Sequence, residues 1–183
     1  MYVVLVPTES SRSLIVPNGR GTFTNVRYYN NEAFAAQCKP NEIQVFSLSD
    51  MGQWMKMRVV RVPIKKTGFT LTLSVGARMR CTSWRENKIH EYTPLDETWT
   101  SHGRVGTDTA GQFNEPFISA DDVSGNILIA DRCNHRLQVM DASGSCKVVS
   151  MRSSVFMPIS ATLFNNHLYV INNKFIYKYV PTV

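Results

Sequence analysis

A chain of 183 residues with 43% hydrophobic and 19% charged residues is long enough to bury a core and is not depleted in apolar residues as disordered chains are. No apolar run approaches the roughly 20 residues of a membrane-spanning helix. The apolar start of the chain lacks the preceding basic region of a signal peptide. The composition therefore predicts one soluble β domain, without a membrane partner.

The first third of the chain contains several predicted strands. Two short apolar stretches, 2–6 and 13–16, precede a repeat that opens near Gly19. In this repeat an apolar strand (33–37) leads through a polar loop (38–41) into a second strand (42–46). Residues 54–62 are an outer-strand candidate.

Basic residues are concentrated between Gly52 and Tyr92, where the net charge is +7 although the whole chain carries +6. This excess would attract a polyanion by counterion release, and Trp54, Trp84 and Tyr92 could stack on bases if they are exposed. The alternative is that the segment forms half-buried strands whose basic side chains, such as Arg78 and Arg80, simply face water.

The same strand, loop and strand order recurs at 79–83, 84–87 and 88–92, followed by an outer-strand candidate at 97–101. It recurs again near the end, where strands at 167–171 and 174–177 flank a short Asn172-Asn173 loop. The aligned positions are Ile43, Ile89, Leu137 and Ile176, spaced by 46, 48 and 39 residues. Such spacing is typical of four-stranded propeller blades.

The clearest copy occupies residues 103–140. Gly111 precedes Phe113 and Pro116, and a short strand then enters a turn at 121–126, in which Gly125 can adopt a positive φ. The apolar strand 127–130 ends at Asp131, and a loop leads to Arg136. We expect Asp131 and Arg136 to hold this loop by an ion pair or by bonds to the backbone.

This copy resembles an NHL repeat, with the family triplet at Asn134, His135 and, one residue late, Leu137. The resemblance implies an all-β fold, a β-propeller of four-stranded antiparallel blades, with about four blades here. The implied repeats are 19–62, 63–101, 102–150 and 151–183. The structural motif residues would be Gly111, Phe113, Pro116, Gly125, Asp131, Asn134, His135 and Arg136.

The last repeat lacks an outer strand, and two readings of residues 1–18 follow. If the chain folds alone, strand 2–6 or 13–16 would pair beside residues 175–180 and protect that open edge. Alternatively, these strands belong to a preceding blade, and the chain is the C-terminal part of a six-bladed propeller.

The resemblance also extends to the NHL domain of tripartite-motif proteins, where the propeller is a binding platform. Loops between the second and third strands and interblade loops would share one face. The implied function is a non-enzymatic module that binds single-stranded RNA, or else a protein-binding domain that recognises substrates for a tripartite-motif-type ubiquitin ligase whose catalytic domain lies elsewhere. The RNA-binding or partner-binding residues would be Lys39, Lys65, Lys66, Trp84, Arg85, Arg104 and Arg132.

Neither an enzymatic site nor a metal site is expected. Some NHL propellers are lyases that hold a metal through several histidines, but His90, His102, His135 and His167 do not have close ligand spacing. No nucleophile or phosphate-loop motif occurs, and no cofactor or small-molecule substrate is expected. Four cysteines without a Cys-X-X-Cys pair predict free thiols in a reducing compartment, the cytoplasm.

Overall fold

The structure is a computed structural model that describes residues 2–6, 12–16, 22–38, 40–65, 70–73, 78–122, 124–149 and 155–180. The regular elements among these residues are β-strands, apart from one short 3-10 helix. They divide into two compact units, Met1–Thr67 and Gly68–Val183. Among the described residues, no helix is long and apolar enough to cross a membrane.

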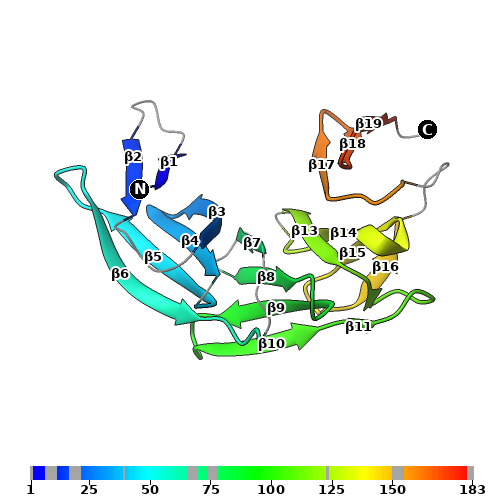
Figure 1. The fold of residues 1–183 in the computed structure, drawn as a ribbon, viewed down its shortest axis with the longest axis horizontal. Helices are drawn as coiled ribbons and strands as arrows, with labels where there is room; N and C mark the ends of the chain where they lie inside the picture. The colour runs from blue at the N-terminus through cyan, green and yellow to red at the C-terminus, as the bar shows by residue number, and fades with distance from the viewer. Residues whose placement is uncertain are drawn as a thin grey trace. The chain divides into compact units, whose positions relative to one another are not determined.

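The first unit contains a hairpin and one four-stranded sheet (Figure 1). The hairpin pairs β1 (Tyr2–Val6) with β2 (Arg12–Val16). The antiparallel sheet consists, in order, of β3 (Thr22–Tyr29), β4 (Glu32–Cys38), β5 (Glu42–Leu48) and β6 (Trp54–Arg61). Buried Ala33, Ala35 and Phe46 pack together in this sheet. Small alanines on the central strand allow the large aromatic ring of Phe46 to fill the space beside them.

The second unit contains three further antiparallel sheets (Figure 1). Sheet two consists of β7 (Thr70–Leu73), β8 (Met79–Ser83), β9 (Lys88–Thr93) and β10 (Thr98–His102). Sheet three consists of β13 (Pro116–Asp121), β14 (Ile127–Asp131), β15 (Arg136–Met140) and β16 (Cys146–Val148). Sheet four consists of β17 (Ser160–Phe164), β18 (His167–Ile171) and β19 (Ile176–Tyr179).

Chain order equals spatial order within each sheet, as expected for an up-and-down blade. The four aligned positions Ile43, Ile89, Leu137 and Ile176 all lie on the third strand of their sheets, β5, β9, β15 and β19. The predicted architecture of four-stranded antiparallel propeller blades is therefore confirmed, with three described strands in sheet four.

Two apolar clusters join the sheets of the second unit. One cluster brings Ile89 of sheet two together with Phe113 and with Ile118, Ile127, Ile129 and Met140 of sheet three. The other joins Ala130 and Leu137 of sheet three to Val155, Ala161 and Val170 beside and within sheet four. Because residues of sheet three take part in both clusters, this sheet is covered on both faces. That arrangement explains the nearly continuous burial of β14.

Between sheets two and three the chain forms an interblade linker, residues 103–115. In it β11 (Arg104–Val105) pairs in parallel with β12 (Gln112–Phe113). Gly103 has a φ of +88°, and a Cβ there would lie 2.3 Å from the ring of buried Phe113. Glycine is therefore required at 103 both for the backbone conformation and for the close approach of Phe113.

The expected pairing of an N-terminal strand with the end of the chain stays a prediction. Among the described strands, β1 pairs with β2, and β19 pairs with β18.

Candidate functional site

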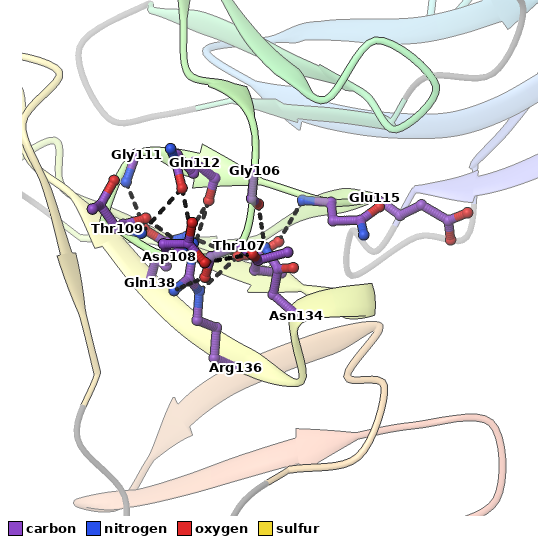
Figure 2. A network of polar contacts seen from close by, with 12 residues as sticks. Gly106, Thr107, Asp108, Thr109, Gly111, Gln112, Glu115, Asn134, Arg136 and Gln138 are labelled. Carbon is purple, nitrogen blue, oxygen red and sulfur yellow. Dashed lines mark hydrogen bonds and ion pairs between the residues drawn. The ribbon is translucent and has the colours of Figure 1, made fainter.

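In the second unit, the loop after the second strand of a sheet contacts the interblade linker. Together these loops and linkers form one surface, which we call the loop face. It comprises the turn 84–87, the linker 103–115, the 3-10 helix η1 (Arg132–Asn134) with His135, and the linker residues 155–158. Hydrogen bonds from Asn134 to the Gly106 carbonyl (2.9 Å) and from the Cys133 amide to the Asn114 carbonyl (3.0 Å) join η1 to the first linker. Figure 2 shows this junction.

Asp131 is the centre of the polar network beneath the loop face. Its carboxylate is fully buried and accepts hydrogen bonds from the Asn114 amide and from the side chains of Asn134, Arg136 and Gln138, all at 2.8–2.9 Å. A buried carboxylate requires this number of donors because burial removes its hydration. All these donors are protein groups of the linker, η1 and β15, so the carboxylate joins these three elements and holds the loop in place.

Arg136 and Gln138 extend the same network into the linker (Figure 2). The Arg136 guanidinium pairs with Asp131 at 2.9 Å and donates to the carbonyls of Thr107, Thr109 and Gln112. Gln138 donates to the Gln112 carbonyl and accepts a bond from the Gly111 amide. These bonds satisfy backbone groups that the irregular linker cannot pair in a sheet.

In both linkers of this unit, a side chain of the preceding loop accepts a hydrogen bond from a linker backbone amide. The side chain of Asn87 accepts a hydrogen bond from the Glu115 amide at 2.8 Å, and Nδ1 of His135 accepts one from the Met157 amide at 3.1 Å. All four residues have positive φ angles. A proline follows the linker residue in both cases, Pro116 and Pro158.

The RNA-binding or partner-binding residues expected from the sequence are only partly placed. Lys39 and Lys66 lie outside the described residues, and Lys65 is exposed in the first unit. On the loop face, the guanidinium of Arg85 lies over the Trp84 ring, 4.7 Å from its centroid, and Arg104 is exposed. Arg132 forms an ion pair with Glu115, so its charge is neutralised locally.

The interpretation that Arg78 and Arg80 simply face water is wrong for Arg80, which is 0% exposed. Its Nε donates to the Glu91 carboxylate at 2.5 Å, and its Nη1 donates to the Gly125 carbonyl at 2.9 Å. Arg78 is exposed but also contacts Glu91 and reaches the Ala142 carbonyl. Strand alternation failed at Arg80 because both arginines reach hairpin turns of the next sheet, and Arg80 is buried against that neighbouring blade rather than facing solvent.

An exposed aromatic pair on the loop face was missed from the sequence. The rings of His135 and Phe156 stack at a centroid distance of 4.9 Å with an interplanar angle of 10°. Phe156 is 63% exposed, so the outer face of its ring is open to solvent. The sequence signal for this pair was the proline that ends each linker, at Glu115-Pro116 and again at Met157-Pro158. It identifies residues 155–158 as the end of an interblade linker.

The histidines do not gather into a metal centre in the described part of the chain, which contains no group of three or more His, Cys, Asp or Glu placed to hold a metal ion. His90 is buried instead, with Nδ1 2.9 Å from Ser101 Oγ and Nε2 3.6 Å from the Glu86 carboxylate. Burial lowers the pKa of His90, and the Glu86 carboxylate opposes that shift.

All four cysteines are free thiols, and Cys38 and Cys81 are buried. Burial raises the pKa of the Cys81 thiol far above its ordinary value. This thiol therefore stays protonated and unreactive at neutral pH.

Comparison with known proteins agrees with the geometry. Residues 117–140 match the family model of the NHL repeat, whereas no curated protein matches the chain. Virginiamycin B lyase from Staphylococcus aureus has a similar fold (TM-score 0.62, 15% identity), with 92% of this chain covering 58% of that protein.

Two further structures are similar. YCF48 from Cyanidioschyzon merolae has a TM-score of 0.59 and 16% identity, with 90% of this chain and 55% of that one covered. A protein of unknown function from Bacteroides caccae has a TM-score of 0.65 and 15% identity, with 92% and 63% covered. The chain thus spans about three fifths of the length of these structures. At such identities the likeness shows the fold alone, and the lyase chemistry in one name stays with that protein. The chain has the fold of β-propeller blades, and its residues 117–140 match the NHL repeat.

Proposed function

We propose that the chain is a non-enzymatic recognition module that binds single-stranded RNA on the loop face of its second unit. The polar groups beneath this face are occupied by structural bonds, which favours a binding surface over a reaction centre. Free cysteines fit a reducing compartment such as the cytoplasm.

The observation that carries the proposal is the presence of two stacking surfaces beside exposed cations. One surface is the Trp84 and Arg85 pair, and the other is the open ring of Phe156 backed by His135. Every base has a π-face, so aromatic rings and guanidinium planes bind single strands with little sequence preference.

The net charge of +7 between Gly52 and Tyr92 overstates the number of basic side chains that could bind phosphates, because several of them form ion pairs. Arg58, Arg78 and Arg80 form ion pairs with Glu32 or Glu91. In contrast, Arg85, Lys88 and Arg104 are exposed and form no ion pair with a described residue. Three cations predict weak to moderate binding that depends on salt.

The test is a titration of a single-stranded RNA of mixed sequence at two salt concentrations. The variants Arg85→Gln and Arg104→Gln should each weaken binding, and each lost phosphate contact should reduce the logarithmic salt slope by roughly 0.7. Phe156→Ala should cost on the order of 1–3 kcal/mol of binding free energy if a base stacks there. Its exposed ring contributes little to the core.

Lys147→Gln is the matched control, because Lys147 is an exposed cation on β16 and lies outside the loop face. This variant should bind as the wild type does. If the folded wild type does not bind RNA at low salt, the RNA proposal fails. A protein partner on the same face would instead bind with little dependence on salt and would still be weakened by Phe156→Ala.

A further inference from the structure

The third strand of sheet four, β19, differs in its pairing from the third strands of the other sheets. In sheets one, two and three, the third strand also pairs with a fourth strand, which is β6, β10 or β16. In the part of the chain that the structure describes, β19 pairs with β18 alone. Its other edge therefore offers backbone N–H and C=O groups to a further strand, as edge strands do.

The side chains of β19 alternate between a covered and an open face. Tyr177 and Tyr179 are partly buried against the apolar cluster shared with sheet three. Ile176 and Lys178 belong to the opposite face, because successive residues of a strand alternate, and both are exposed. Ile176 is 70% exposed, although the residues aligned with it in the other three sheets are fully buried. The aligned apolar position is thus left uncovered in sheet four.

The charge around this edge is positive. Lys174 and Lys178 are both exposed, and no acidic residue follows Asp141 in the sequence. Lys178 forms no ion pair with a described residue. Opposite-charge pairs and apolar pairs across two antiparallel strands both stabilise a sheet. A strand that brings an acidic group to Lys178 and an apolar group to Ile176 would therefore complement this edge.

We propose that the free edge of β19 binds an extended peptide segment of a partner protein, with an acidic residue opposite Lys178 and an apolar residue opposite Ile176. The peptide runs antiparallel to β19, as the fourth strand does in the other three sheets. In its sequence the acidic residue precedes the apolar residue by two positions. Backbone hydrogen bonds supply the affinity, and the two side-chain positions supply the selectivity.

The strands at the start of the chain are less suited to this edge. β1 and β2 pair with each other, and neither contains an acidic residue. β2 begins with Arg12, which would bring a further cation to an edge that is already positive. The charge of the edge therefore favours a partner over the chain's own strands.

The probe is the peptide acetyl-Thr-Val-Thr-Glu-Thr-Val-Thr-amide, titrated into the intact, isotope-labelled protein. The backbone amide NMR signals of residues 176–179 report the site and should shift on binding. Replacing the glutamate of the peptide by glutamine should weaken binding by up to about fivefold, which is the size of an opposite-charge pair across two strands. If the signals of β19 do not shift, the proposal is wrong.

N-methylation of the peptide tests for strand pairing. In a strand bound at an edge, the amides of alternate residues face the sheet and the others face solvent. Of two peptides, one methylated at the amide nitrogen of the glutamate and one at that of the following threonine, one should therefore lose binding and the other should keep it. Equal affinity of the two peptides would exclude strand pairing and overturn the proposal.

Lys178→Glu should reverse the charge preference, so that a peptide with lysine in place of glutamate binds more tightly than the original. Lys147→Glu is the matched control, because Lys147 is exposed and the variant has the same change in net charge, but its strand β16 pairs with β15. This control should keep the preference of the wild type. Reversal in both variants would reduce the effect to net charge and contradict the site.

Single-stranded RNA is the competing ligand for a basic edge. If RNA shifts the signals of β19 and displaces the peptide, the edge belongs to an RNA-binding surface and the peptide proposal fails. The variants Arg85→Gln and Phe156→Ala on the loop face should leave peptide binding unchanged, so the two proposals can fail separately.

Discussion

The residue after the aligned Ile or Leu of the third strand is polar and buried in three sheets: Gln44, His90 and Gln138. Gln44 donates to Gln37, and Gln138 donates to Asp131, each an acceptor on the neighbouring second strand. His90 instead bonds Ser101 on the fourth strand. A buried polar side chain at this position is tolerated because a cross-strand partner satisfies it.

We expect His90 to make the stability of the fold dependent on pH. Burial lowers the pKa of His90 below its ordinary value of 6.5, Glu86 opposes this shift, and Lys88 and His102 add to it. The unfolded chain therefore binds more protons than the folded chain below about pH 6.5. Stability should decrease as the pH falls from about 6.5 through the lowered pKa of the folded state, and should be unaffected by His90 above that range.

The measurement is the free energy of unfolding in urea at pH 7.5 and pH 5. His90→Gln, which copies Gln44 and Gln138, should lose less stability between these pH values than the wild type. His167→Gln removes a histidine from sheet four and is the control. Identical pH dependence in His90→Gln and the wild type would show that another group is responsible.

Among the elements, the interblade linker 103–115 depends most on side chains from outside it. It has one short parallel pairing of its own, and the side chains of Asp131, Arg136 and Gln138 bond backbone groups of Asn114, Thr109 and Gln112. Such a segment is ordered by the neighbouring sheet rather than by local propensity.

Replacing Asp131 should loosen this linker. Asp131→Ala removes the acceptor that Asn114, Arg136 and Gln138 share, and we expect a loss of about 1–3 kcal/mol in the free energy of unfolding. Asp131→Asn keeps one acceptor oxygen and should lose less. Binding of RNA, measured well below the melting temperature, should survive in both variants. If binding is lost while stability is unchanged, Asp131 belongs to the binding site.

The sequence predicted the elements better than it predicted the surfaces. Spacing of Ile43, Ile89, Leu137 and Ile176 located the third strands, because blades repeat a fixed number of strands and turns. Alternation failed at Arg80, since a residue on a blade faces another blade and not water. The Phe156 and His135 stack joins residues from a linker and a loop, so no local pattern predicted it.

At the scale of the whole molecule, stability should come from interfaces between neighbouring sheets, as in other repeat proteins. In the second unit these interfaces are continuous. Sheet three packs on Ile89 of sheet two and on Ala161 and Val170 of sheet four. Polar bonds from Arg80 to the Gly125 carbonyl and from the Met157 amide to His135 accompany the apolar contacts.

Residues 68–183 should therefore fold when they are produced without residues 1–67. Both apolar clusters of this unit lie wholly within 68–183, so the truncation removes none of their buried residues. The methyl signals of Ile129, Leu137 and Val170 should keep the chemical shifts that they have in the full chain, and urea unfolding should remain cooperative. The control is the same fragment with Leu137→Ala, which should lose about 2–5 kcal/mol by creating a cavity in the cluster shared by sheets three and four. Collapsed methyl shifts in the unaltered fragment would mean that the second unit depends on the first for its core, and that the two units fold only together.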